Sequence, residues 1–261
     1  MRSTRSAQLA PQRAARALNQ GPVRRWDKAA YAAVFIVLAL TAAQCARLGT
    51  AGLFVQTGQY EVDRLFSASR APGKAEISRA AQYFSHSLEY VADNPWALEG
   101  AGALDLARMR ASRRPVEAVA AARDAHTRFH QALLQRPSSP FLWTNLALTK
   151  LYLDEIDGEL MAALRHADEL GPWEPTVQQT FVFVGLAVWQ DLDAGLQQAL
   201  ARAIRRGASR NRVKMYEIVK SYARFDLVCA IDEYRLIAGP DCKKGAEAVR
   251  SSAPVNKGYR R

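Results

Sequence analysis

Residues 29–46 form an uncharged, mostly apolar stretch that lies between Lys28 and Arg47. As an α-helix these eighteen residues would be about 27 Å long, at ~1.5 Å per residue. That length is close to the ~30 Å hydrocarbon core of a bilayer, and the two flanking cations can extend their charges to the headgroups. Trp26 and Tyr31 lie where aromatic residues gather at membrane interfaces. The stretch therefore predicts a transmembrane helix over residues 29–46.

The charges on the two sides of this stretch are asymmetric. The basic arm, residues 1–28, carries seven Lys and Arg and one Asp, so it holds +6 of the chain's net charge of +11. Only Arg47 and Arg64 follow the span within roughly twenty residues, and cations collect on the cytoplasmic side of a membrane span. We therefore expect the arm to be cytoplasmic and the rest of the chain to lie outside.

Two other interpretations of the apolar stretch remain open. A cleavable signal peptide also has an apolar centre, and Thr41, Ala42 and Ala43 supply the small residues that a signal peptidase accepts. A buried helix of a soluble protein could be equally apolar. The long basic arm favours a retained span, and both secretory interpretations place the rest of the chain on the same side of the membrane.

The composition favours an all-α protein. Apolar residues make up 49% of the chain and charged residues 23%, which excludes a disordered chain and a polytopic membrane protein. Ala, Leu and Arg are abundant, and β-branched residues rarely alternate with polar ones as they do in strands. Both features favour helices. Three cysteines are too few for a disulfide-rich miniprotein or a Cys-only zinc site.

Two segments, 80–102 and 125–147, follow the same order of residue types. Each has a small residue, an aromatic residue four positions later, a proline-bearing turn, and a helix that opens with a large residue followed by small ones. A third turn occurs at 171–175. Small residues let two helices approach closely, and proline at a first helical position costs no hydrogen bond. The pattern predicts helix–turn–helix units in which the second helices begin at the turn prolines Pro95, Pro140 and Pro175.

These residues resemble the tetratricopeptide repeat. The match is best at Ala125, Phe129, Ala132, Pro137, Trp143, Leu146 and Ala147, and the repeat-like region covers about residues 74–188. The resemblance implies a tetratricopeptide-like α-solenoid of antiparallel helix pairs after the transmembrane helix. By repeat register, the partner-binding groove would be lined by Phe141, Thr144, Asn145, Leu148 and Tyr152.

The expected organisation has five parts. They are a basic cytoplasmic arm at 1–28, the transmembrane helix at 29–46, a spacer helix at 47–73, a helical-repeat domain at 74–242 and a disordered basic tail at 243–261. The last part of the repeat domain is expected to hold helices near 175–188, 191–206, 211–224 and 226–237.

The whole layout resembles the VpsP-type accessory proteins of bacterial exopolysaccharide biosynthesis. The motifs that carry this resemblance are the Trp-Thr-Asn-Leu-Ala-Leu helix at 143–148 and the turn at 170–175. The resemblance implies a single-pass inner-membrane protein with a periplasmic scaffold domain and protein partners in an envelope polysaccharide complex. A periplasmic chaperone or maturation module, for example in cytochrome assembly, is the alternative.

A basic segment near the end of the expected domain is a candidate for binding anionic surfaces. It contains Arg202, Arg205, Arg206, Arg210, Arg212 and Lys214. Outside the membrane the accessible polyanions are lipid headgroups and acidic polysaccharide, so we expect no nucleic acid partner. A merely solvated helix face is the alternative.

Cys229 and Cys242 are expected to form a disulfide in an oxidising periplasm, where closing such a loop would stabilise the domain by about 3 kcal/mol; two unrelated thiols are the alternative. Cys45 is the third cysteine and has no expected partner.

His126 and His130 share a helix face but have no third ligand nearby in the sequence, so we expect no metal site. The acidic run at 154–159 is expected to be a solvated turn that supplies an N-cap. No nucleophile, phosphate-loop or dinucleotide motif occurs, so we expect no catalytic residue, no cofactor and no enzyme.

Overall fold

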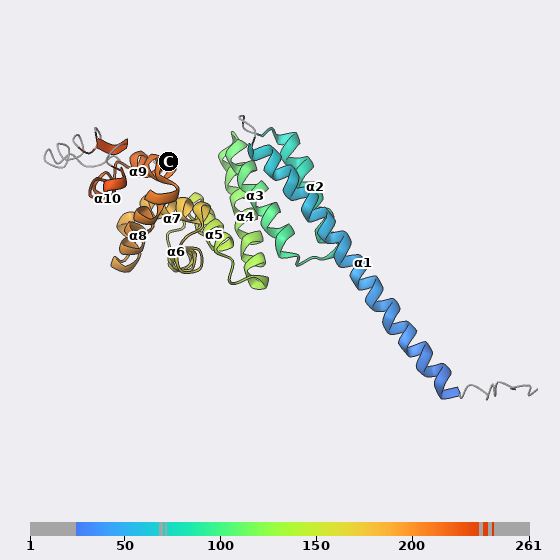
Figure 1. The fold of residues 1–261 in the computed structure, drawn as a ribbon. Helices are drawn as coiled ribbons and strands as arrows, with labels where there is room; N and C mark the ends of the chain where they lie inside the picture. The colour runs from blue at the N-terminus through green and yellow to red at the C-terminus, as the bar shows by residue number, and fades with distance from the viewer. Residues whose placement is uncertain (1–24, 68–69, 71, 235–236, 240–241, 243–261) are drawn as a thin grey trace, which may run out of the picture. The chain divides into compact units, whose positions relative to one another are not determined.

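The computed structural model describes residues 25–67, 70, 72–234, 237–239 and 242, and these residues form helices and turns with no strand among them. The predicted all-α class is therefore confirmed for this part of the chain. In chain order (Figure 1) the helices are α1 (Arg25–Ser67), α2 (Lys74–Tyr90), α3 (Pro95–Ala111), α4 (Pro115–Gln135), α5 (Pro140–Tyr152), α6 (Gly158–Leu170), α7 (Pro175–Ala187), η1 (Trp189–Asp191), α8 (Ala194–Arg210), α9 (Arg212–Ser221), α10 (Asp226–Cys229) and η2 (Asp232–Tyr234).

Helix α1 contains the apolar stretch. Within the described residues it alone is long and apolar enough to cross a membrane, and a signal sequence would meet the same criteria. Its residues 28–49 are all exposed. The chain divides into two compact units, residues 1–46 and residues 47–261. The predicted basic arm up to residue 24 and the predicted tail at 243–261 lie outside the described residues.

The part of α1 that follows Arg47 differs from the expected spacer. Ala51, Val55 and Leu65 are buried, and the last two pack with Ile77 and Phe84 of α2 in one hydrophobic cluster. This segment therefore belongs to the packed domain, because its buried side chains share one hydrophobic cluster with residues of α2 and α3.

Local sequence signals set most helix starts. Helices α3, α4, α5 and α7 each begin with proline, which confirms the predicted starts at Pro95, Pro140 and Pro175. The N-cap side chains of Asn94 and Ser139 accept hydrogen bonds from backbone N–H groups in the first turns of α3 and α5. These caps satisfy donors that have no partner inside the helix.

The helices of residues 47–261 pack mainly on their neighbours in the chain. In addition, α5 packs on α7 and α7 on α9, so alternate helices also touch (Figure 1). A single large core joins α3–α9 and includes Phe129, Leu142, Leu164, Phe181 and Leu200, all of them almost completely buried. Each helix from α5 to α8 therefore contributes side chains to one continuous interior.

The described chain after α9 is interrupted where one helix was expected. The sequence favoured one helix near 226–237, whereas the described residues up to Tyr234 form α10 and the short η2, with Ala230 and Ile231 between them outside any helix. Tyr234 explains the break, because its buried hydroxyl donates to the backbone carbonyl of Ile204 in α8 at 2.9 Å. Satisfying that buried hydroxyl requires the chain to turn back onto α8.

Candidate partner-binding surface

The five predicted groove residues lie on α5 and divide into two groups. Thr144 and Leu148 are buried, so they contact the protein interior instead of solvent. Phe141 is exposed, while Asn145 and Tyr152 are half-buried. The Tyr152 hydroxyl accepts a hydrogen bond from the Arg110 guanidinium of α3 at 3.3 Å. The surface that α5 offers to a partner thus consists of Phe141, Asn145 and Tyr152.

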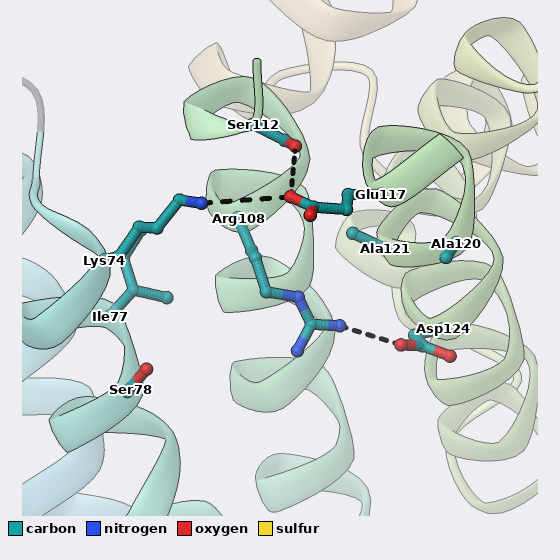
Figure 2. Close-up of a pocket in the computed structure, with 9 residues that line it drawn as sticks. All are labelled: Lys74, Ile77, Ser78, Arg108, Ser112, Glu117, Ala120, Ala121 and Asp124. Carbon is teal, nitrogen blue, oxygen red and sulfur yellow. Dashed lines mark hydrogen bonds and ion pairs between the residues drawn. The ribbon is translucent and has the colours of Figure 1, made fainter. Parts of the chain in front are cut away.

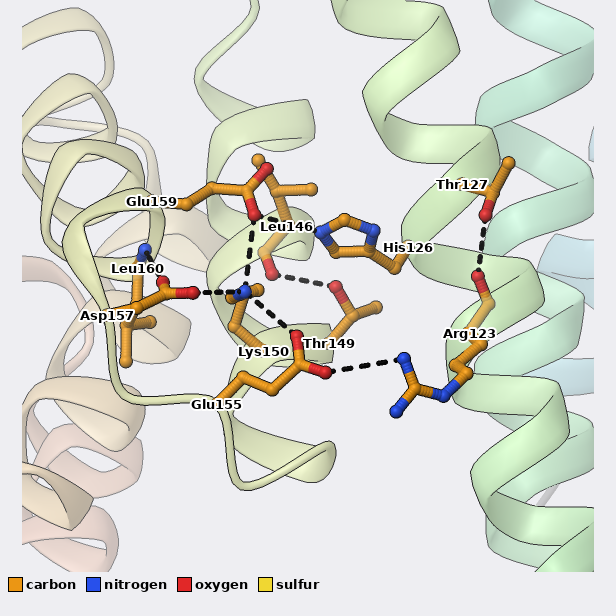
Figure 3. Close-up of polar contacts among 10 residues, drawn as sticks. All are labelled: Arg123, His126, Thr127, Leu146, Thr149, Lys150, Glu155, Asp157, Glu159 and Leu160. Carbon is orange, nitrogen blue, oxygen red and sulfur yellow. Dashed lines mark hydrogen bonds and ion pairs between the residues drawn. The ribbon is translucent and has the colours of Figure 1, made fainter.

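A buried ammonium group lies next to this surface on the same helix. The Lys150 side chain is only 5% exposed, and its Nζ contacts three carboxylates from the α5–α6 turn and the start of α6 (Figure 3). The N–O distances are 2.8 Å to Glu155, 2.6 Å to Asp157 and 3.2 Å to Glu159. We call Lys150 and these three acids the Lys150 cluster.

The Lys150 cluster also reaches α4. His126 Nε2 lies 3.3 Å from a Glu159 carboxylate oxygen, and Arg123 Nη1 lies 3.4 Å from Glu155 (Figure 3). The Asp157 side chain also accepts from the backbone N–H of Leu160 at 3.1 Å, which confirms the predicted N-cap in the acidic run. The three carboxylates therefore tie α5 to the start of α6 through Lys150 and to α4 through Arg123 and His126.

The contacts within the cluster shift the pKa values of Lys150, Glu155 and Asp157 in favour of their charged forms. Burial by itself lowers the pKa of Lys150, but hydrogen bonds to Asp157, Glu155 and Glu159 outweigh it, and the pKa is raised overall. The hydrogen bond from Lys150 lowers the pKa of Glu155. Burial raises the pKa of Asp157, yet hydrogen bonds from Lys150 and Leu160 lower it overall. An ammonium held protonated in this way is a structural tie and a poor nucleophile or base.

The sequence analysis missed Lys150. The signal was its place in the mostly apolar run of residues 146–151, followed by an acidic run that begins a few residues later. A lysine in the interior needs an anionic partner, so the two features together predict an ion cluster. The spacing alone does not reveal that the turn folds back over the helix.

The predicted anionic-surface residues on α8 and α9 do not all face solvent in the same way. Arg202, Arg205, Arg210, Arg212 and Lys214 are exposed. The sixth residue, Arg206, is turned inward: its guanidinium pairs with the Asp168 carboxylate of α6 and donates to the Pro172 carbonyl. The charge of Arg206 is therefore neutralised by an ion pair within the domain.

Stacking of a cationic or imidazole side chain on tryptophan occurs in three successive helix pairs of the described chain. Trp96 and Trp143 lie in the first turns of α3 and α5, whereas Trp173 lies in the turn just before α7. The covering side chain lies near the end of the second helix of each pair. The pairs, with distances from the guanidinium carbon or imidazole centroid to an aromatic ring, are Trp96 with Arg136 (3.4 Å), Trp143 with His166 (4.4 Å) and Trp173 with Arg206 (5.9 Å). A further contact of this kind lies outside these pairs, where the Arg224 guanidinium carbon is 4.0 Å from the centre of a Trp189 ring.

A pocket of about 440 Å³ lies between α2, α3 and α4 (Figure 2). Two cations and two anions line it and pair across the opening: Arg108 lies 2.7 Å from Asp124, and Lys74 lies 3.8 Å from Glu117. The charges balance, so the pocket has no excess of one sign that would attract a charged ligand. We assign no ligand to it.

Cys229 and Cys242 form a disulfide, with Cα atoms 5.6 Å apart, and Cys45 is a free exposed cysteine. Cys45 makes a simple thiol count possible. We expect alkylation of the denatured, unreduced protein to label one cysteine, and alkylation after reduction to label three, as measured by intact mass. Labelling of all three before reduction would contradict the disulfide.

A scan against protein-family models finds no match to this chain, and a search of curated proteins finds none either. The tetratricopeptide-like and VpsP-type resemblances therefore remain predictions that rest on the motifs themselves.

Proposed function

We propose that the protein is a non-enzymatic, membrane-anchored helical-repeat scaffold in the bacterial periplasm, an accessory protein of exopolysaccharide biosynthesis or export. The observation that carries the scaffold is the stacking on tryptophan that recurs in α3–α4, α5–α6 and α7–α8. Chains built from like helix pairs grow into solenoids whose extended surfaces bind protein partners. The additional contacts of α5 with α7 and of α7 with α9 support such an arrangement.

The proposed location follows from α1 and the charges around it. The apolar length of this helix fits a single span, and the arginine-rich arm before it fits a cytoplasmic N-terminus. The remainder of the chain would then lie in the periplasm, anchored to the inner membrane by α1. The disulfide between Cys229 and Cys242 supports an oxidising compartment.

Two surfaces are proposed for two kinds of contact. The solvent-accessible groove residues Phe141, Asn145 and Tyr152 would bind a protein partner, because aromatic side chains are enriched at such interfaces. The exposed cations of α8 and α9 would contact acidic polysaccharide or lipid headgroups.

Photo-crosslinking in living cells tests the partner surface. We would place p-benzoylphenylalanine at Asn145 in the full chain, and at the exposed Gln131 of α4 as the matched control. We expect a discrete adduct from position 145, with a protein of the envelope polysaccharide machinery, and none from position 131. A broad set of unrelated client proteins would favour the chaperone alternative, and equal labelling from both positions would contradict a specific groove.

Reporter fusions test the topology. We expect alkaline phosphatase fused after Arg261 to be active, and the same enzyme fused before Met1 to be inactive, because that enzyme folds only in an oxidising compartment. The reverse result would overturn the proposed orientation. Loss of an N-terminal tag from the mature protein would identify α1 as a cleaved signal sequence.

A further inference from the structure

The first residue of the second compact unit, Arg47, is tied to the end of α2. Its Nε donates a hydrogen bond of 2.5 Å to the backbone carbonyl of Tyr90, the last residue of α2. An arginine at this position also balances the negative end of the helix dipole. The C-terminal end of α2 therefore lies at the level of Arg47.

Exposed aromatic and aliphatic side chains lie close along the chain to both partners of this tie. Tyr90 is 40% exposed and stacks on Phe54 of α1, with ring centroids 5.9 Å apart. Leu48 and Leu53 of α1 are also exposed. Large apolar side chains gathered on a surface usually mark a binding site.

Trp96, at the start of α3, is the next large exposed side chain along the sequence after Tyr90. It is 49% exposed, and the Arg136 guanidinium lies 3.4 Å from the centre of one of its rings. Arg136 is held there by an ion pair of 2.6 Å with Glu99. One face of the indole is thus fixed by the protein, and its remaining exposed surface faces solvent.

Chain continuity identifies what covers the patch. Arg47 is the first charged residue after the apolar stretch of α1, so in a spanning helix its guanidinium marks the boundary between hydrocarbon and headgroups. Groups that touch Arg47 must lie at the same depth. Tyrosine, tryptophan and arginine are the residues that prefer this depth, since their rings are amphipathic and their cations meet lipid phosphate.

We propose that Leu48, Leu53, Tyr90 and Trp96, together with Arg47, form a membrane-docking collar that inserts into the headgroup layer of the bilayer that holds α1. The collar would mount the domain directly on the membrane surface. This inference rests on the proposed span, so its test must separate the two.

Depth-dependent quenching in proteoliposomes of phosphatidylethanolamine and phosphatidylglycerol provides that test. In full-length protein with Cys45→Ser, single cysteines would be introduced by Trp96→Cys, Val116→Cys and Leu40→Cys and labelled with the fluorophore NBD. Val116 is the matched control, because it is an apolar side chain at the start of α4 that is 81% exposed. Leu40 reports on the span itself. Tyr90→Cys serves as a second collar position if Trp96→Cys fails to fold.

We expect lipids brominated near the headgroup to reduce emission from position 96 by roughly twofold, with little effect at position 116. Lipids brominated deep in the acyl chains report on position 40: strong quenching there, with no quenching at position 96 by lipids brominated near the headgroup, would overturn the collar and leave the span intact. No quenching at position 40 by the deeply brominated lipids would remove the span and the collar together. A label at position 96 that is shielded from aqueous iodide but not quenched by brominated lipid would also overturn the proposal, since a protein would then cover the patch.

Discussion

Replacing Gly100 with alanine is expected to destabilise the domain by about 3 kcal/mol, because the site is overpacked by a single methyl group. A Cβ at this position would lie 2.3 Å from two ring carbons of Phe84. The Phe84 ring has no room to move, since it is fully buried and Gly58 also packs against it. A Cβ built on Gly58 would lie 2.8 Å from a carbon of this ring. The measurement is urea unfolding of the full chain in detergent, with circular dichroism as the readout.

The matched control for this substitution is Gly158→Ala. Gly158 is the first residue of α6, and a Cβ there would have no atom within 4 Å. We expect this variant to unfold at the same urea concentration as the parent, or at a slightly higher one, because alanine restricts the unfolded chain.

A double variant tests the contact with Phe84. The loss of unfolding free energy in Gly100→Ala combined with Phe84→Leu should be smaller than the sum of the two single losses. Equal stability of the Gly100→Ala and Gly158→Ala variants would contradict the tight contact.

Replacing Lys150 with methionine is expected to cost about 3 kcal/mol at neutral pH, because three carboxylates lose their shared cation. Methionine fills a similar volume, so the loss reports on charge more than on packing. The carboxylates are partly exposed, which keeps the effect at the lower end of the range for a broken buried ion pair. Thermal unfolding of the full chain measures it, and the surface variant Lys214→Met should behave like the parent.

The pH dependence of the same variant gives a second readout. The folded-state pKa values of Glu155 and Asp157 are lowered, so their stabilising effect is complete above the ordinary values of 4.5 and 3.8 and is lost as the pH falls through the lowered values. The stability difference between the parent and Lys150→Met should therefore shrink in acid. A difference that stays constant down to the acid unfolding transition would show that packing, and not charge, caused the loss.

Local chemistry was sufficient for the helical class and for most helix starts. Pro95, Pro140 and Pro175 predict helix starts because proline fixes φ and lacks the N–H that a first turn cannot satisfy. Asp157 predicts an N-cap for a similar reason, and the uncharged stretch before Arg47 predicts a long apolar helix. These signals act within a few residues, so they can be read without knowing which helices meet.

The candidate site was only partly predictable. Repeat register placed Phe141, Asn145 and Tyr152 together on α5, but Thr144 and Leu148 of the same predicted set are buried. The register gives the angular position of a residue on its helix, whereas burial depends on how closely the neighbouring helices approach. Periodicity along one helix carries no information about that distance.

The contacts between distant residues required the folded chain. Arg47 meets Tyr90, Trp96 meets Arg136, and Tyr234 reaches Ile204, although each pair is separated by thirty or more residues. Each contact depends on the angle and spacing between packed helices, and these are set by the volumes of many side chains at once. The sequence therefore shows where helices begin and which stretch suits a bilayer, whereas helix packing determines which charges are buried and which aromatic rings remain exposed.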